Sequence, residues 1–306
     1  MEHLGFVGVG LMGEGIASSA MRRGHRLTVV AHQKRAAVDR LVAAGAQEAT
    51  SLEALAATVD AVAICVTDAP AVEAVVAGLG AGLRPGQMIL DISTSQPATS
   101  RRLAEALADR GVRFVDAPVT GGPDDAMAGR LATLLGAGED DAPRARALAD
   151  AWSAKVRHFG AVGTGHTAKL INNFVTQGTI ALLAEAYGRA HRAGVDWHGL
   201  HDVMLTGAAR SGTLERIVTP ALDGNFDGLP FTVRNAEKDV RYYAALAQEM
   251  DGAPSPIADA LHATFSAHVD HGRGDAFVSR LLDPDVDAAA NRSIDADSDA
   301  GTGRSS

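Results

Sequence analysis

The first half of the chain repeats one pattern, in which a short run rich in β-branched residues is followed by an alanine-rich helical stretch. The runs with strand character lie at residues 3–9, 26–31, 60–66, 87–93 and 112–118. The helical stretches between them, several of which end at glycine, lie at residues 11–24, 35–45, 70–80 and 97–111. Strands that alternate with helices run parallel, and their helices cover both faces of the sheet. The pattern therefore predicts a doubly wound parallel sheet, which the runs at 129–138 and 155–160 extend at one edge.

After Gly163 the pattern changes to helix alone. Residues 164–193 contain no proline and keep a helical periodicity, which predicts one long helix. Further helical segments follow at residues 196–205, 211–218, 232–250 and 256–272. We therefore predict an α/β chain with an N-terminal Rossmann domain at 1–162 and an all-α C-terminal domain at 163–282, joined by the long helix. The remaining segment, 283–306, is acidic and rich in Ser, Gly and Ala, so we predict that it is disordered.

The charge and the composition exclude several classes of partner and site. A net charge of −9 argues against a nucleic acid or an anionic membrane, since either would require a basic surface. No run of ~18 uncharged apolar residues predicts a membrane span, and the first residues, MEHLGFVGVG, do not resemble a signal peptide. The single cysteine, Cys65, lies in an apolar run and is interpreted as a packing residue in a cytoplasmic protein. Two pairs of histidines three residues apart lack a third ligand at metal-like spacing, so we predict no metal site.

The segment GFVGVGLMGEG combines the end of a strand, a glycine-rich turn and the start of a helix. Gly8 permits the tight turn, Gly10 lets a pyrophosphate approach the backbone, and Gly13 lets the helix pack closely on the strand. Leu11 and Met12 begin the helix, whose free N–H groups and positive dipole end favour phosphates. We therefore predict that this turn binds a dinucleotide and is more than a structural turn.

The end of the second strand indicates which dinucleotide binds. An Asp or Glu there would bind the ribose 2′-hydroxyl of NAD. The chain instead has His32, Lys34 and Arg35 in this region, and its two permanent cations are suited to a 2′-phosphate. The alternative is that Lys34 and Arg35 only open an exposed helix. We predict NADP as the cofactor, with NAD as the alternative.

The segment GTGHTAKLINN carries polar groups on a helix that is otherwise apolar. Residues three and four apart lie on one face of a helix, so Lys169, Asn172 and Asn173 project in roughly the same direction. The apolar neighbours Leu170 and Ile171 point elsewhere and are free to pack. An ammonium group and two amides on one face are interpreted as a site, the alternative being that Lys169 is an ordinary surface lysine.

Four motifs occur in one register over about residues 2–282: GFVGVGLMGEGIA, DISTSQP, DAPVTGGPDDAMAGRLATLLGAG and GTGHTAKLINN. With a fifth, RNAEKDV, they resemble those of the β-hydroxyacid dehydrogenase family, which includes 3-hydroxyisobutyrate dehydrogenase and tartronate semialdehyde reductase. The resemblance implies an NAD(P)-dependent oxidoreductase that interconverts a small 3-hydroxy acid and its semialdehyde. It also implies a homodimer or homotetramer, because members of the family interleave their helical domains.

The resemblance assigns the catalytic roles to the long helix. Lys169 matches the catalytic lysine of the family, and Asn173, one turn on, matches the amide that helps to hold the substrate. Asn172 is a secondary candidate. A lysine can remove the hydroxyl proton and return it if a cleft of low dielectric and a second cation lower its pKa towards neutrality.

The resemblance also identifies a loop that binds the substrate carboxylate. Thr120, Gly121 and Gly122 match this loop, where the family usually has Ser-Gly-Gly. Backbone N–H groups of the two glycines, with the threonine hydroxyl, are suited to form a small anion-binding nest. Asp125 stands where the family more often has glycine, and a carboxylate near the loop would repel a second anionic group of the substrate.

The cofactor contacts of the family correspond to four further positions: Val66, Thr67, Thr94 and Lys238. Lys238 matches a lysine that reaches the nicotinamide region and would supply the second cation. It is alternatively a solvated helix cation beside Asp239.

Three rival functions can be distinguished by the residue type at position 169 or at position 172. Oxidative decarboxylases of the 6-phosphogluconate type have histidine where this chain has Asn172, and imine reductases typically lack the lysine. A non-catalytic dinucleotide-binding module would also be expected to lack it. The presence of Lys169 therefore favours a dehydrogenase or reductase of a 3-hydroxyisobutyrate-like acid, with tartronate semialdehyde or another short semialdehyde as the alternative substrate.

Overall fold

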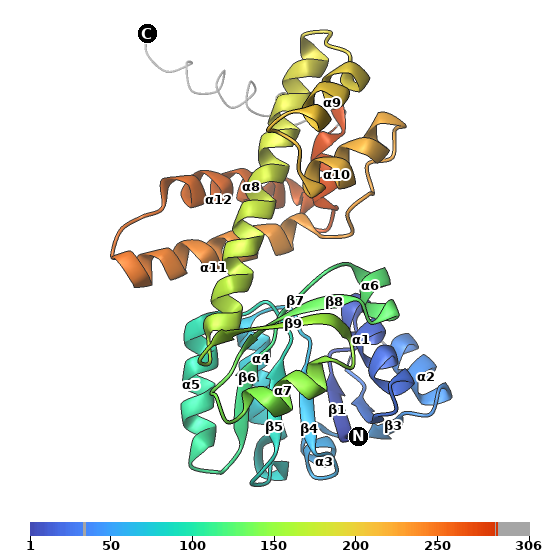
Figure 1. The fold of residues 1–306 in the computed structure, drawn as a ribbon, viewed down its shortest axis with the longest axis vertical. Coiled ribbons are helices and arrows are strands. Elements are labelled where there is room, and N and C mark those ends of the chain that lie inside the picture. Colours follow the sequence, from blue (N-terminus) through green and yellow to red (C-terminus); the bar gives the residue numbers. More distant parts are fainter. Residues whose placement is uncertain (33–34, 285, 287–306) are drawn as a thin grey trace, which may run out of the picture. The chain divides into compact units, whose positions relative to one another are not determined.

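The computed structural model describes residues 1–32, 35–284 and 286 (Figure 1). The described residues belong to two compact units, Met1–Ile171 and a second that begins at Asn172. Lys34 and almost all of the acidic segment predicted to be disordered lie outside the described residues.

Within the described part of the first unit, nine strands form one sheet. In spatial order, eight of them are β3 (Gln47–Ala49), β2 (Arg26–Val30), β1 (His3–Val7), β4 (Ala61–Ile64), β5 (Met88–Asp91), β6 (Arg113–Asp116), β8 (Leu131–Gly136) and β7 (Val119–Thr120). The ninth, β9 (Ser153–Gly160), pairs with β8. The strand order reverses between β1 and β4, which is where open sheets of this kind bind ligands at the carboxyl ends of their strands.

The sheet is parallel from β3 to β6 and mixed beyond it. The two predicted edge strands form β8 and β9, but β8 runs antiparallel to β6, with Asp116 opposite Gly136. The reason is that β6 and β8 are joined by a short excursion through β7 and α6 (Pro123–Ala128), which turns the chain back instead of crossing the sheet. The predicted fold class is confirmed, with this mixed edge as a refinement.

The four predicted helices of the first unit are α1 (Leu11–Arg22), α2 (Ala36–Ala43), α4 (Ala69–Leu79) and α5 (Pro97–Ala108). Three shorter helices were not predicted: α3 (Leu52–Ala56), α6 and α7 (Ala142–Ala149). Helix α3 begins where the Ser51 side chain accepts a hydrogen bond from the Ala54 N–H group, at 3.0 Å.

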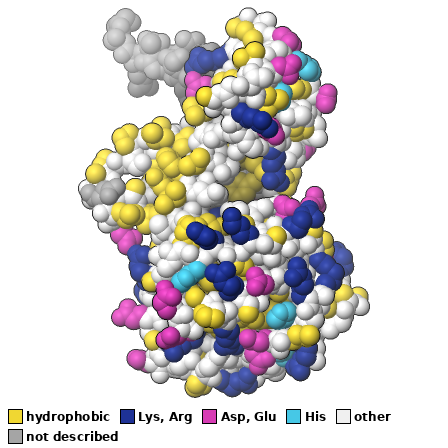
Figure 2. All heavy atoms as spheres, viewed as in Figure 1, with side chains coloured by type: hydrophobic (Ala, Val, Ile, Leu, Met, Phe, Trp, Pro, Cys, Tyr) yellow, Lys and Arg dark blue, Asp and Glu magenta, His cyan; other side chains and the backbone are white. Residues whose placement is uncertain are grey.

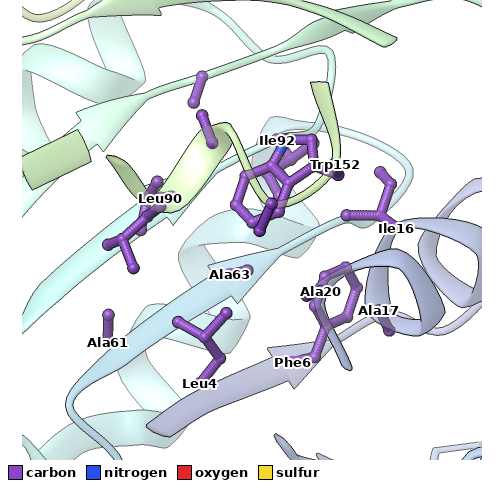
Figure 3. Packing of buried hydrophobic residues seen from close by; sticks show 14 of the residues in the cluster. Leu4, Phe6, Ile16, Ala17, Ala20, Ala61, Ala63, Leu90, Ile92 and Trp152 are labelled. Carbon is purple, nitrogen blue, oxygen red and sulfur yellow. The ribbon is translucent and has the colours of Figure 1, made fainter. Parts of the chain in front are cut away.

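The core of the first unit lies on both faces of the sheet. Successive side chains of a strand point to opposite faces, so Met88 and Leu90 of β5 belong to one apolar cluster and Ile89 to the other. In the first cluster, Figure 3 shows the fully buried Trp152 on the same side of the sheet as Ile16 of α1. Apolar cover on both faces is why these strands read as continuous hydrophobic runs.

The second unit is built from helices, and an isolated β-bridge between Thr232 and Phe277 lies outside them in its described residues. Helix α8 (Thr164–Arg192) starts in the first unit and ends in the second. It is followed by α9 (Trp197–Thr206), α10 (Gly212–Leu222), α11 (Val233–Asp251) and α12 (Pro256–His268), with a π-helical turn at Val269–Arg273 and a 3-10 helix at Val278–Leu282. Their core includes the fully buried Ile180, Tyr187 and Phe265. No helix of the described residues is both long enough and apolar enough to cross a membrane.

Candidate active site

The glycine-rich turn between β1 and α1 is closed by close backbone contacts. Gly8 has a φ of +93°, and a Cβ atom there would lie 2.1 Å from the Cys65 carbonyl oxygen. A Cβ atom on Gly13 would lie 1.9 Å from the Gly8 carbonyl oxygen. Glycine is therefore required at both positions, by a left-handed backbone at Gly8 and by close packing at Gly13. At Gly10, by contrast, no heavy atom of the described residues beyond its own chain neighbours lies within 4 Å of the added Cβ atom.

The start of α1 is suited to a phosphate group. Gly10 is the N-cap residue, and in the described chain no side chain caps the helix there. The first N–H groups of an α-helix lack partners within the helix, and this applies here to Leu11 and Met12, the first two residues of α1. These residues fit the pyrophosphate of a dinucleotide.

Ser93 joins the carboxyl ends of β4 and β5. The predicted cofactor contacts Val66, Thr67 and Thr94 follow these two strands. The Val66 N–H group donates to Ser93 Oγ at 3.0 Å, and the Ser93 N–H group donates to Asp91 Oδ1 at 3.0 Å. This serine was not singled out from the sequence, although it lies inside the DISTSQP motif.

The thiol that precedes Val66 is unsuited to nucleophilic chemistry. Burial, helped by the nearby Asp91 carboxylate, raises the pKa of Cys65 to about 12. The thiolate, which is the reactive form, is therefore scarce at neutral pH. This supports the interpretation of Cys65 as a packing residue.

Beyond the end of β2, two of the three side chains predicted to select the cofactor, His32 and Arg35, are described, and both are exposed. The third, Lys34, lies outside the described residues. Arg35 donates hydrogen bonds to Asp39 and Glu48, each with a shortest distance of 3.0 Å. A 2′-phosphate would therefore share this guanidinium group with two carboxylates.

The first turn of α8 is held by a buried carboxylate from the end of β6. Asp116 is fully buried and accepts the Gly163 N–H group at 2.6 Å and the His166 N–H group at 2.7 Å. Burial raises the pKa of Asp116 above its ordinary value, although the nearby imidazole and these N–H groups act in the opposite direction. A Cβ atom on Gly165 would lie 2.5 Å from the Leu134 carbonyl oxygen, so the helix start also packs closely on β8.

The His166 side chain is fully buried and connects α8 to two other elements. Its Nδ1 atom lies 2.8 Å from Ser100 Oγ of α5, and its Nε2 atom lies 3.1 Å from the Ser93 carbonyl oxygen. Lys169, which is half-buried, follows it by three residues, close to one turn of the helix. Sequence reasoning missed the roles of Asp116, His166 and Ser100, because their partners are far apart in the chain. The one signal was that His166 lies in the segment GTGHTA, whose other residues are small.

Asn173, one turn after Lys169, is held by α11. It is buried, and its Nδ2 atom donates to Asp239 Oδ2 at 2.6 Å, while its Oδ1 atom accepts a hydrogen bond from Asn172 at 3.2 Å. The other Asp239 oxygen lies 3.0 Å from the Lys238 ammonium group. Asn172 itself is exposed, so the two neighbouring amides have different surroundings.

Lys238 is a buried lysine, which argues against its being a solvated helix cation. It is 9% exposed, and its ammonium group lies 5.4 Å from the centre of the Tyr242 ring. Together with the Asp239 carboxylate, this ring compensates part of the cost of burying the charge.

The Thr120–Gly122 loop is bonded to a carboxylate from the helix that follows it, that of Asp125 in α6. Gly121 has a φ of +122°, and a Cβ atom there would lie 2.7 Å from Leu131, so glycine is required. The Gly122 N–H group donates to Asp125 Oδ2 at 3.1 Å, and Arg130 pairs with Asp125 Oδ1 at 3.2 Å. One of the two N–H groups predicted to bind a substrate carboxylate thus already has a partner within the chain.

Comparison with known proteins agrees with this geometry. Residues 3–160 match the family model for the NAD binding domain of 6-phosphogluconate dehydrogenase. Residues 163–284 match the model described as NAD-binding of NADP-dependent 3-hydroxyisobutyrate dehydrogenase. A crystal structure of 3-hydroxyisobutyrate dehydrogenase from Salmonella typhimurium superposes with a TM-score of 0.81 at 30% identity, covering 92% of this chain and 98% of that one.

Two curated relatives show the range of proteins that share this sequence pattern. The 3-hydroxyisobutyrate dehydrogenase of Pseudomonas aeruginosa is 31% identical over 88% of this chain and 92% of its own length. The cytokine-like nuclear factor N-PAC of Xenopus tropicalis is also 31% identical, over 86% of this chain, but the match spans only 49% of that protein. The chain therefore spans about half the length of N-PAC.

The chain belongs to the 3-hydroxyisobutyrate dehydrogenase-like β-hydroxyacid dehydrogenase family, as the sequence motifs predicted. Its relatives include 3-hydroxyisobutyrate dehydrogenases and an NAD-dependent L-serine dehydrogenase from Pseudomonas aeruginosa, which agrees with the predicted class, an NAD(P)-dependent dehydrogenase acting on CH–OH groups.

Proposed function

We propose that this protein interconverts a small 3-hydroxy acid and its semialdehyde with NAD(P), and that Lys169 transfers the proton. The observation that carries the proposal is the position of Lys169 on α8, about one turn from the anchored His166 and one turn from the anchored Asn173. A reactive lysine between two fixed points of a helix is held in a defined position, as proton transfer requires.

The bound nicotinamide would accept or donate the hydride, and the residues of the chain would handle the proton and the orientation. In the oxidative direction the Lys169 amine takes the hydroxyl proton, and in the reductive direction the ammonium group returns it to the carbonyl oxygen. Asn173 has a second amide hydrogen besides the one that bonds to Asp239, and this hydrogen is suited to a substrate oxygen. The Thr120–Gly122 loop would hold the carboxylate.

For the cofactor we propose NADP, with NAD as the alternative. The match to the family model named for an NADP-dependent enzyme supports this choice, as does the exposed Arg35 beyond the end of β2. The ion pairs of Arg35 with Asp39 and Glu48 reduce the preference, because a phosphate must compete with two carboxylates. The proposed cofactor contacts are the predicted ones: Gly8, Gly10, Leu11, Met12, Gly13, His32, Lys34, Arg35, Val66, Thr67, Thr94 and Lys238.

We also propose that the chain assembles as a homodimer or homotetramer. Helix α8 exposes Ile171, Val175 and Leu182, whose spacings of four and seven residues place them on one face. Their exposed fractions are 48%, 62% and 71%. An apolar helix face of this kind is characteristic of an interface between subunits.

We keep one second candidate, a non-catalytic dinucleotide-binding module, because one relative, N-PAC, is named as a nuclear factor and not as an enzyme. Both candidates bind the cofactor, and they differ in turnover. Lys169 is the residue that distinguishes them, because a binding module has no use for a proton-transferring group between two anchored residues.

Turnover in a substrate matrix tests the proposal. The purified protein is assayed by nicotinamide absorbance with NAD and NADP, oxidised and reduced, against 3-hydroxyisobutyrate, 3-hydroxypropionate, glycerate, tartronate semialdehyde and the matching aldehydes. We expect turnover with one cofactor, and Lys169→Met is expected to lower kcat at least about 100-fold. The control is Lys155→Met, an exposed lysine of β9. Cofactor binding without turnover of any substrate would favour the binding module.

A further inference from the structure

The buried imidazole of His166 is not needed for the packing of an apolar core, yet it is fully enclosed. An apolar side chain would fill the same space without the cost of burying a polar ring. Each of its nitrogen atoms instead has a polar partner from a different element, Ser100 of α5 and the backbone that follows β5. This arrangement points to a role beyond filling space.

The hydrogen-bond partners define the tautomer of the ring. A carbonyl oxygen only accepts, so the Nε2 atom must carry a hydrogen and donate it to the Ser93 carbonyl oxygen. In the neutral ring the Nδ1 atom then accepts from the Ser100 hydroxyl group. The carboxylates of Asp91 and Asp116 lie 3.8 and 3.9 Å from the two nitrogen atoms. Both ring nitrogens are therefore satisfied, and the ring has one orientation.

Ser93 connects this ring to the proposed cofactor side of the site. Its backbone carbonyl accepts from His166, while its hydroxyl accepts from the Val66 N–H group at 3.0 Å. Val66 is one of the proposed cofactor contacts, and Lys169 follows His166 by three residues on the same helix. Hydrogen bonds on either side of Ser93, one buried and one partly buried, thus join the turn after β4 to the helix that carries the lysine.

We propose that His166 is a positioning residue, which fixes Lys169 relative to the ends of β4 and β5 through its bonds to Ser93 and Ser100. The inference rests on the proposed function, because it assigns to His166 the placement of the proton-transferring lysine. A misplacement of the reacting group by about 1 Å can lower the rate about 100-fold. Loss of this anchor therefore acts on kcat, and it leaves the binding of cofactor and substrate largely intact.

The experiment compares three variants with the full-length wild-type protein. His166→Ala removes both bonds, Ser100→Ala removes only the Nδ1 partner, and His166→Gln keeps an N–H group that can reach the Ser93 carbonyl oxygen. The matched control is His158→Ala, because His158 also bonds a backbone carbonyl, that of Ala137 at 2.8 Å, but lies on β9. Each protein is measured for kcat, KM, NAD(P)H dissociation constant and melting temperature.

We expect His166→Ala to lower kcat about 10- to 100-fold, with KM and the NAD(P)H dissociation constant within about threefold of the wild type. His166→Gln should recover most of the rate, Ser100→Ala should lose a few-fold, and His158→Ala should keep the wild-type kcat. If His166→Ala and Ser100→Ala lower only the melting temperature and keep kcat, the residue is structural and the inference is wrong. If His166→Ala does not fold, Ser100→Ala and His166→Gln decide between these results.

The same measurements distinguish a wrong positioning role from a wrong proposed function. If the proposed function is wrong, the wild-type protein itself shows no turnover that depends on Lys169, and the positioning role is overturned with it. Wild-type turnover that depends on Lys169, together with an unchanged kcat in the His166 and Ser100 variants, overturns the positioning role alone.

Discussion

At the scale of single residues, Asp125 occupies one of the N–H donors that the proposed substrate loop would offer to a carboxylate. Its carboxylate accepts the Gly122 N–H group at 3.1 Å and also pairs with Arg130. A substrate carboxylate must displace this side chain or bind with the remaining donors of the loop. A second anionic group on the substrate would meet the negative charge of Asp125, which favours monocarboxylates.

Removal of this carboxylate is expected to tighten the binding of the acid. Asp125→Gly should lower KM for a 3-hydroxy monocarboxylate about tenfold and leave kcat nearly unchanged, because one hydrogen bond to a charged group is worth about 1.5–3 kcal/mol. A dicarboxylate should gain more. Steady-state kinetics checks this, with Asp124→Gly, the exposed neighbour on α6, as the control. An unchanged KM would mean that the Gly122 N–H group does not contact the acid.

At the scale of elements, the start of α8 depends on Asp116. The first N–H groups of a helix need acceptors, and here a buried carboxylate from β6 accepts two of them. The sequence pattern predicted the helix and its approximate start, since glycine and threonine precede a long periodic run. It did not predict the acceptor, because Asp116 and His166 are 50 residues apart.

Asp116→Ala is expected to lower the free energy of unfolding by about 2–4 kcal/mol, because two buried N–H groups lose their acceptor. Chemical denaturation followed by circular dichroism measures this change. Asp109→Ala, an exposed residue at the end of α5, is the control and should stay within about 0.5 kcal/mol of the wild type. An equally small effect for Asp116→Ala would show that α8 starts without this acceptor.

The Asp116 carboxyl group is expected to make the protein less stable as the pH rises. Burial raises the pKa of Asp116 in the folded state, so the folded protein binds this proton more tightly than the unfolded chain does. The contribution of the group to stability is therefore greatest at acid pH and falls as pH rises through the folded-state pKa. Asp116→Asn, which cannot ionise, should gain stability relative to the wild type as pH rises over this range. A constant difference between denaturation midpoints would contradict the raised pKa.

At the scale of the whole molecule, the apolar side chains on the helical unit suggest where copies of the chain meet. Figure 2 shows hydrophobic side chains gathered over α11 and α12, where Met250 and Ile257 are 68% and 67% exposed. Helix α8 adds the exposed face that includes Val175 and Leu182. Apolar area of this kind is unfavourable in water, and association removes it from the solvent.

A charge placed on this surface is expected to break the assembly. The double variant Val175→Glu/Leu182→Glu should shift the protein towards the monomer, because two carboxylates would have to be buried at the interface. Light scattering coupled to size-exclusion chromatography measures the mass. Val42→Glu, on an exposed position of α2, is the matched control and should keep the wild-type mass. An unchanged mass in the double variant would place the interface elsewhere.

Short elements show why part of the fold was not predicted. Strand β3 has three residues, two of them exposed, and is held by pairing with β2. Helices α3 and α6 have five and six residues, which is too short for a periodic apolar pattern, whereas α7 was missed although it has eight residues, as many as the predicted α2. The longer strands and helices were predicted because each presents enough residues for its period to be read.

The sequence by itself determined the alternation of strands and helices, the glycine turn, the long helix and the family, because each is encoded by residues close together in the chain. Only the tertiary structure decided that β8 runs antiparallel, that Asp125 bonds to the substrate loop, and that Lys238 is buried. It alone decided that Ser93, Asp116 and His166 meet at the start of α8. The physical reason is that a hydrogen bond between distant residues depends on where the chain returns, and no local period or propensity records that position.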